Sequence, residues 1–463
     1  MKKLIYQLLP RLWGNGRFSG IDQASLHYMK ESLGMDYIWC TGVIRHATRT
    51  GDHPQKVVKG DAGSPYAITD YYDVNPYLAD YAPDRMEEFK SMVQRVHEAG
   101  LGLIIDFVPN HVARENVNFD GDDFYYFPGE ALRLPVEADG YEEFPARASG
   151  NVFTSAPSVN DWYETVKLNY GDTHSATWDK MRDIVLFWAG LGVDGFRCDM
   201  VELVPPAFMK WLIASVKKQY PSVIFIAEVY EKEKYRMYVE NVGFDLLYDK
   251  SGLYDTLRAV TCYGASARGI TGNWQFLGDL QPHMLNFLEN HDEQRLASDF
   301  FARTPEAGYA ALAVSLLLND APFMLYFGQE AGERGMQKEG FSGLDGRTSI
   351  FDWCRVPALE KPDKKVLSRY EDILFWSKHP VFAQGKTYDL CYCQEAGFNP
   401  DRHFAFARAW GYESFLVIAN FGNTQDITVQ IPGDAEQYLD VRLSKTVYTV
   451  TVPEKDFVLL KLQ

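Results

Sequence analysis

Eight short apolar runs, separated by amphipathic segments, constrain the fold of this chain more than any other feature. The runs lie at 4–10, 37–44, 101–109, 195–200, 223–229, 244–248, 284–288 and 322–327. They lack the polar alternation of a strand with one solvated face, which is typical of parallel strands that are buried on both sides. Eight such strands with helices between them predict an α/β fold, a (β/α)8 barrel.

The spacing of the runs predicts three domains. The third and fourth runs begin at 101 and 195, whereas the fifth begins at 223, so we expect a subdomain inserted after the third strand. Beyond residue 380 apolar and polar residues alternate, which predicts antiparallel strands. We therefore predict a barrel over 1–110 and 172–380, an inserted domain over 111–171, and a C-terminal β-sandwich domain over 381–463.

Composition and termini exclude several classes of function. Asp and Glu outnumber Lys and Arg by 63 to 46, for a net charge of −17, so we expect no nucleic-acid or anionic-membrane surface. No apolar run reaches the roughly 20 residues of a membrane span. The first apolar run is short for a signal peptide, so we expect a cytoplasmic protein, or a secreted one if a leader was removed. The six cysteines show no framework spacing and are expected to be buried thiols.

Four predicted strands end in charged or imidazole side chains. The endings read DFVPNH, GFRCDM, IAEV and FLENHD. In a parallel barrel the carboxyl ends of the strands form one rim, where polar residues are catalytic candidates. A carboxylate at a single strand end is more often structural, but four such endings at one rim favour an active site.

Asp199 and Glu228 are the candidates for a catalytic pair. Arg197 and Asp199 are two residues apart on one strand, so they share a face, and the guanidinium group would keep Asp199 ionised. Glu228 ends the next strand and has no cation in its own strand, which would leave it protonated as a general acid. Adjacent strands lie about 4.8 Å apart, close to the ~5–5.5 Å carboxyl separation of retaining glycosidases. A structural ion pair between Glu228 and Arg197 is the alternative.

The four endings, in this order and spacing, resemble the signature regions of the α-amylase family, glycoside hydrolase family 13. The resemblance covers essentially the whole chain. It implies that Asp199 is the nucleophile and Glu228 the acid/base. It also implies that Asp292 is a third carboxylate, which binds sugar hydroxyls and favours the distorted transition state.

The resemblance also implies a set of substrate-binding residues. His111, Arg197 and His291 would hold the glycosyl unit, with Asp106 bracing the arginine, and Tyr66 would stack under the sugar ring. Aromatic residues near the rim are further candidates for sugar subsites: Trp13, Tyr71, Tyr72, 124–127, Trp162, Tyr163 and Tyr230.

Three positions depart from the family pattern. Gly63 stands where α-glucosidases of the family carry an Asp that grips the terminal glucose, which implies a more open cleft. Lys167 stands where calcium-dependent α-amylases have an Asp ligand, and its ammonium group could occupy the space of the cation. We therefore expect no required cofactor or metal, and we interpret the Asp-rich loop 120–123 as a solvated acidic loop rather than a calcium site. Glu202 replaces a Lys beside the subsite of the leaving sugar.

These observations predict a retaining hydrolase of α-1,4-linked glucose chains such as maltodextrins or starch, acting through a covalent glycosyl-enzyme. A transglycosylase would use the same residues and a sugar acceptor in place of water. A non-catalytic glucan-binding protein is a third interpretation, disfavoured because all three carboxylates are present. The expected partner is an α-glucan oligosaccharide or polysaccharide. A monomer is favoured because no extra module precedes the barrel.

Overall fold

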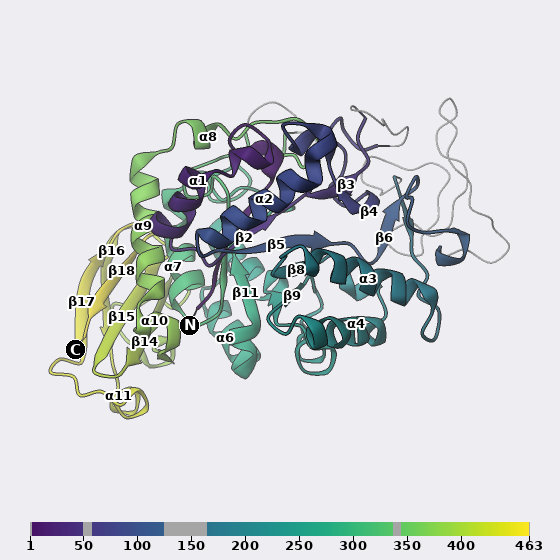
Figure 1. Cartoon of the computed structure of the whole chain (residues 1–463). Coiled ribbons are helices and arrows are strands. Elements are labelled where there is room, and N and C mark those ends of the chain that lie inside the picture. Colours follow the sequence, from purple (N-terminus) through teal and green to yellow (C-terminus); the bar gives the residue numbers. More distant parts are fainter. Residues whose placement is uncertain (1, 50–57, 125–163, 337–343, 463) are drawn as a thin grey trace.

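Eight parallel strands close a barrel, as the sequence predicts. The computed structural model describes residues 2–49, 58–124, 164–336 and 344–462. The barrel strands follow the order β1-β12-β11-β10-β9-β8-β5-β2 around the closed sheet (Figure 1). Their bounds are β1 (Leu4–Leu8), β2 (Tyr37–Cys40), β5 (Gly102–Phe107), β8 (Gly195–Cys198), β9 (Ile224–Ala227), β10 (Leu246–Tyr248), β11 (Met284–Phe287) and β12 (Phe323–Tyr326).

Helices surround the barrel, and several of them bury one apolar face against it. In α2, for example, Phe89, Met92, Val93 and Val96 are buried, at the spacing of one helical face. Helix α7 is buried at every position. The helices are α1 (Gln23–His27), α2 (Arg85–Glu98), α3 (Ala176–Gly190), α4 (Pro206–Gln219), α5 (Asp255–Tyr263), α6 (Arg268–Leu277), α7 (Tyr309–Leu317), α8 (Pro357–Glu360), α9 (Lys364–Lys378) and α10 (Pro380–Gln384).

The register of the barrel brings three strand ends to one level. Asp106 pairs with Arg197, and Cys198 pairs with Ala227. Past the last pair, the amide of Asp199 donates to Phe107 O at 2.9 Å, and the amide of Glu228 donates to Cys198 O at 3.3 Å. The side chains that follow β5, β8 and β9 therefore share one rim.

Two antiparallel pairs extend from this rim. Strands β3 (Ile44–His46) and β4 (Ile68–Val74) pair after β2, and β6 (His111–Ala113) pairs with β7 (Thr165–Lys167) after β5. Figure 1 shows β3, β4 and β6 at the end of the molecule opposite the C-terminal sheets. The β6–β7 pair lies inside the predicted insertion, and residues 125–163 of that insertion lie outside the described residues.

The C-terminal segment forms antiparallel sheets, as predicted. A four-stranded sheet has the order β13-β14-β15-β18 beside the pair β16-β17, and side chains of both sheets share one apolar core. Cys391–Cys393 forms a 3-10 turn. The bounds are β13 (Lys386–Asp389), β14 (His403–Trp410), β15 (Glu413–Asn420), β16 (Gln425–Gln430), α11 (Gly433–Leu439), β17 (Val447–Val452) and β18 (Phe457–Lys461).

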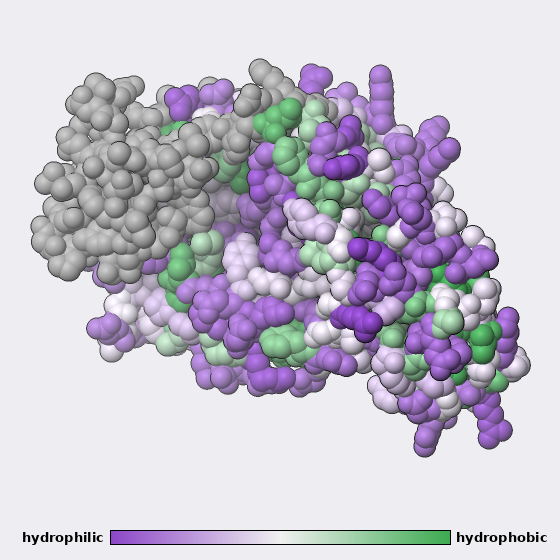
Figure 2. Space-filling model, turned by 180° about the vertical axis from the view of Figure 1, so that it is seen from behind, coloured by the Kyte–Doolittle hydropathy of each residue, from purple (hydrophilic) through white to green (hydrophobic). Residues whose placement is uncertain are grey.

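The visible surface is mostly polar. The face in Figure 2 is largely hydrophilic, with its hydrophobic residues in separate patches. Within the described ranges, no helix combines the length and apolar character needed to cross a bilayer. All six cysteines lie in these ranges as free thiols. Cys40 and Cys198 are buried as expected, whereas the other four are only partly buried, which corrects the prediction for them.

Candidate active site

A cavity of about 280 Å³ opens at the carboxyl ends of the barrel strands. Five of the seven predicted site residues line it, and the other two, Arg197 and His291, are buried beside them. The lining residues are Lys59, Ser64, Tyr66, His111, Glu164, Thr165, Asp199, Met200, Glu228, Tyr230, Asp292, Ile350 and Phe351.

Arg197 holds both predicted catalytic carboxyls. Its Nη1 is 2.5 Å from Asp199 Oδ1, and its Nη2 is 3.0 Å from Glu228 Oε2. Glu228 has no cation in its own strand, as predicted, but the guanidinium group from the neighbouring strand reaches it, so the ion pair with Arg197 that was the alternative is present. The two carboxyls, from adjacent strand ends, therefore contact the same guanidinium group.

Two further groups hold Glu228. The hydroxyl of Tyr230 donates to Glu228 Oε1 at 2.7 Å, and the amide of Met200 donates to Oε2 at 2.8 Å. Met200 follows Asp199 directly and adopts a left-handed backbone conformation with φ of 50°, which is strained for a side chain of this size. This turn aims the Met200 amide at the neighbouring strand end.

Opposing influences act on the ionisation of Asp199. Burial raises the pKa of the Asp199 carboxyl well above its ordinary value, Arg197 opposes this rise, and the charge of Glu228 adds to it. A single guanidinium shared by two buried acids does not compensate both charges. Burial and the Glu228 carboxyl therefore oppose the ionised Asp199 that the sequence predicts, and Arg197 favours it.

Tyr66, His291 and Asp106 form one buried network under the cavity. The Tyr66 hydroxyl lies 2.5 Å from His291 Nε2 and donates to Asp106 Oδ1 at 3.2 Å, and the Tyr66 and His291 rings stack with centroids 5.3 Å apart. Asp106 Oδ1 is 3.7 Å from Arg197 Nη1, so it braces the arginine as the resemblance implies. The network fixes the position of the Tyr66 ring at the cavity wall.

Asp292 and His111 complete the cavity. The pKa values of both side chains are lowered, which keeps Asp292 ionised and His111 neutral near pH 7. Burial opposes ionisation of Asp292, but His291, 3.1 Å away, lowers the pKa of Asp292 to about 2. The Asp292 side chain is 44% exposed. Burial and the charge of Lys167 lower the pKa of His111 to about 3. His111 Nε2, 3.9 Å from Asp199 Oδ2, is therefore neutral near pH 7.

Lys167 bridges the β6–β7 pair to the barrel. Its Nζ donates to Asn110 Oδ1 at 2.5 Å and to Leu203 O at 2.9 Å, and burial lowers the pKa of Lys167 to about 8. A calcium ion needs several oxygen ligands and negative charge, and here an amine faces the two oxygens. These residues therefore do not fit a calcium ion at this position.

The acidic loop 120–123 is not simply solvated. Asp123 is buried and lies 2.5 Å from Lys180 Nζ, and Asp120 lies 3.2 Å from the same nitrogen. Asp123 also accepts a hydrogen bond from Thr177 at 2.7 Å. The loop is thus tied to helix α3 by a lysine that compensates its charge.

Several candidate positions take other roles. Of the described aromatic candidates only Tyr230 lines the cavity, whereas Trp13, Tyr71 and Phe124 are buried in the core. Residues 125–127, 162 and 163 lie outside the described residues. Glu202 accepts hydrogen bonds from the amides of Tyr230 at 2.8 Å and Glu231 at 3.2 Å, so its carboxylate shapes the loop after β9.

Gly63 cannot carry a side chain in this backbone. Its φ is +74°, and an added Cβ would lie 1.7 Å from Ala47 O. The segment that contains Gly63 turns under the cavity wall at this point. An Asp at this position would therefore need a different local backbone.

Sequence reasoning missed some residues of the site. Gln7 Nε2 lies 2.8 Å from His291 Nδ1, and a polar residue inside the fully buried run LIYQL is a signal that could have found it. Lys59, Glu164 and Phe351 line the cavity but follow no strand-end pattern, so the sequence offers no signal for them.

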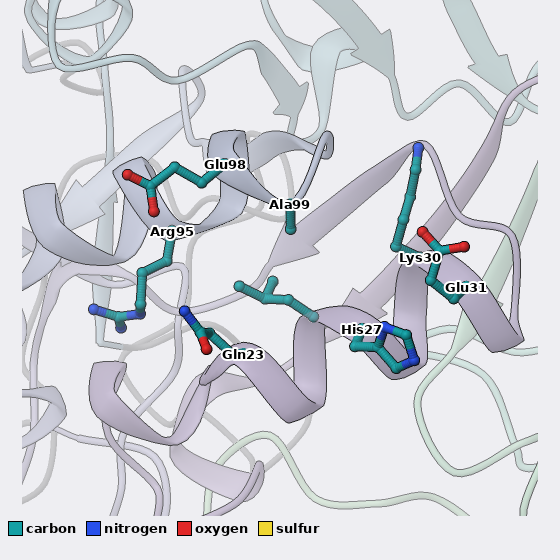
Figure 3. Close-up of a pocket in the computed structure, with 8 residues that line it drawn as sticks. Gln23, His27, Lys30, Glu31, Arg95, Glu98 and Ala99 are labelled. Carbon is teal, nitrogen blue, oxygen red and sulfur yellow. The ribbon is translucent and has the colours of Figure 1, made fainter.

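A second hollow, of about 340 Å³, lies on the outside of the barrel. Figure 3 shows it between helix α1, with the π-helical turn that follows, and helix α2. Its two cationic side chains donate hydrogen bonds to backbone carbonyls: Lys30 Nζ to Gly100 O at 3.0 Å and Arg95 Nη2 to Phe18 O at 2.7 Å. Two of its charged side chains are therefore engaged with backbone carbonyls, and none of the predicted site residues lines it.

Comparisons with known proteins give a family match over most of the chain. The sequence model of the family described as "Alpha amylase, catalytic domain" matches residues 11–365. The α-amylase MalA of Haloarcula japonica is 27% identical over 445 residues, which are 94% of this chain and 57% of MalA. An α-1,4-glucan:maltose-1-phosphate maltosyltransferase of Picrophilus torridus is 27% identical over 255 residues, which are 52% of this chain and 35% of that protein.

One solved structure shows the same fold along the whole chain. A noncanonic maltogenic α-amylase AmyB from Thermotoga neapolitana superposes with a TM-score of 0.71 at 21% identity, over 99% of this chain and 96% of that chain. The chain spans little more than half of MalA and about a third of the maltosyltransferase.

Proposed function

The chain belongs to the α-amylase catalytic-domain family, and from this premise we propose that it is a retaining glycoside hydrolase that cleaves α-1,4-glucosidic bonds in maltodextrins or starch. One observation carries the proposal. The carboxyls of Asp199 and Glu228 come from adjacent strands, contact the two terminal nitrogens of the buried Arg197 guanidinium group, and line the same cavity.

The roles follow from where each group lies. Asp199, beside His111, attacks the anomeric carbon while Glu228 gives its proton to the leaving oxygen, and the glycosidic bond breaks. Glu228 then takes a proton from water, which attacks the anomeric carbon and frees Asp199. Asp292, ionised at neutral pH, stabilises the positive charge that develops on the sugar ring.

A fluorosugar experiment tests this mechanism. A 5-fluoro-α-glucosyl fluoride should form a covalent adduct on Asp199 that peptide mass spectrometry locates. Asp199→Asn should form no adduct, and both Asp199→Asn and Glu228→Gln should lose at least about 1,000-fold in kcat on maltoheptaose. Equal background turnover in wild type and Asp199→Asn would instead favour the non-catalytic glucan-binding protein.

The second candidate is an α-glucan transglycosylase with the same residues. It is favoured by one finding, that a matching relative is named a maltosyltransferase. A timed product profile on maltoheptaose separates the two, because products longer than the substrate require transfer, whereas a hydrolase yields only shorter ones.

We also propose that the enzyme needs no metal and works as a monomer in the cytoplasm. Lys167 supports the first point, since its ammonium group joins Asn110 and Leu203. The free thiols of all six cysteines support a reducing compartment.

A further inference from the structure

One wall of the cavity contains polar groups that the proposed reaction does not use. Lys59 and Glu164 line the cavity and are only 4% and 3% exposed. The Glu164 Oε2 atom is buried and has no hydrogen-bond partner among the residues that the structure describes. Buried polar atoms in folded proteins nearly always have a partner, so this oxygen is available to a hydroxyl group of a ligand.

The strand order places this wall on the donor side of the scission point. Lys59 lies in the connection after β2, and Phe351 lies in the connection after β12. These two strands flank β1, which stands opposite β9 in the closed strand order. Glu228 and Tyr230 follow β9. Because the general acid faces the leaving group, the opposite wall faces the glycosyl donor.

The two side chains also act on each other. Burial raises the pKa of the Glu164 carboxyl, and the charges of Lys59 and Arg114 oppose the rise. Lys59 Nζ lies 5.5 Å from the centroid of the Phe351 ring. The wall thus combines a cation, an acceptor oxygen and an aromatic ring, the groups with which proteins bind the hydroxyls and apolar face of a pyranose.

We propose that Lys59 and Glu164 bind hydroxyl groups of the second glucosyl unit of the donor, the unit next to the scissile one towards the non-reducing end. This inference rests on the proposed function and deepens it, because it makes the preferred donor a chain of at least two α-linked glucosyl units. Lys59 donates to one hydroxyl and Glu164 accepts from a neighbouring one, while Phe351 packs against the ring.

Two chromogenic substrates test the inference. p-Nitrophenyl α-glucoside offers only the scissile glucosyl unit, whereas p-nitrophenyl α-maltoside adds the second one. Glu164→Gln and Lys59→Met should lower kcat/KM for the maltoside by about 10- to 100-fold, the range for hydrogen bonds to charged groups. They should change kcat/KM for the glucoside by less than about twofold. Glu115→Gln, at an exposed position just past β6, is the matched control and should change neither.

The outcomes are distinct. An equal loss of kcat/KM on both substrates would show that Lys59 and Glu164 only support the fold. Wild-type kcat/KM on both substrates would show that they do not touch the donor. Either result overturns the inference. A wild-type rate in Asp199→Asn would instead overturn the proposed function. In that case titration calorimetry with maltose and methyl α-glucoside makes the same comparison, and only a loss of maltose affinity in both variants supports the wall as a sugar site.

Discussion

Replacement of Lys167 by methionine tests how an amine holds this active-site end together. Lys167 Nζ contacts Asn110 Oδ1 and Leu203 O, and burial lowers the pKa of Lys167 from 10.5 to about 8. At about 1.36 kcal/mol per pH unit, this difference corresponds to about 3 kcal/mol for keeping the proton in the folded protein. Methionine removes that cost but leaves two carbonyl oxygens without a donor, at about 1–3 kcal/mol each.

The sign of the pH dependence follows from the two pKa values. Below pH 8 the amine is protonated in both the folded and the unfolded protein, so stability does not change with pH through this group. Between pH 8 and 10.5 only the unfolded protein keeps the proton, so the free energy of unfolding rises with pH. Wild type should therefore gain about 3 kcal/mol relative to Lys167→Met across this window. Guanidinium unfolding followed by tryptophan fluorescence, in EDTA, measures this difference, and the exposed Lys210→Met should show none.

A third variant tests whether the position is competent for a metal. Lys167→Asp places a carboxylate beside Asn110 Oδ1 and Leu203 O, a set of oxygen ligands suited to calcium. Millimolar calcium should raise the unfolding midpoint of this variant and leave that of wild type unchanged. The reasoning is refuted if EDTA lowers the activity of wild type and calcium restores it. It is also refuted if the difference between wild type and Lys167→Met stays constant from pH 8 to 10.5.

Three further changes probe the rim. Gly63→Ala should lower the melting temperature more than Gly34→Ala. Both glycines have a left-handed backbone, which costs an alanine about 1–2 kcal/mol, but only at Gly63 would the added Cβ collide with Ala47 O. Equal losses of stability would contradict the collision. His111→Gln should lower kcat yet leave the acid limb of the pH–rate profile in place, since the pKa of His111 is about 3; a limb that moves would show that His111 titrates in the working range. Arg197→Lys should cost at least about 100-fold in kcat, because one ammonium group cannot contact two carboxyls as the guanidinium fork does; a near-normal rate would mean that the shared contact is dispensable.

The barrel could be predicted from the sequence because its signals are local. Each strand is a continuous apolar run, and α2 repeats its buried residues Phe89, Met92, Val93 and Val96 at helical spacing. The strand-end residues could be predicted for the same reason, since a charged side chain after a buried run has few other places to lie. Cys391 and Cys393 show the limit, because alternation alone predicts a strand where the chain makes a 3-10 turn.

The rest depends on contacts between distant segments. The guanidinium of Arg197 reaches Glu228 from another strand, and no spacing in the sequence encodes which of two acids an arginine will contact. Lys59 and Glu164 are more than a hundred residues apart and meet the cavity from connections without a repeating pattern. Their positions follow from how those connections fold over the rim, which a single sequence does not reveal.

The shared contact with Arg197 does not by itself assign different roles to the two acids. Because one guanidinium lies against both carboxyls, charge alone does not distinguish a nucleophile from a general acid in the free site. Their surroundings differ, since Asp199 lies near His111 and Glu228 accepts a hydrogen bond from Tyr230, and the proposed roles follow this difference. The substrate completes the assignment, because only one arrangement puts a proton next to the glycosidic oxygen and a free carboxylate next to the anomeric carbon. The proposed roles therefore rest on position, and the fluorosugar adduct on Asp199 is their direct test.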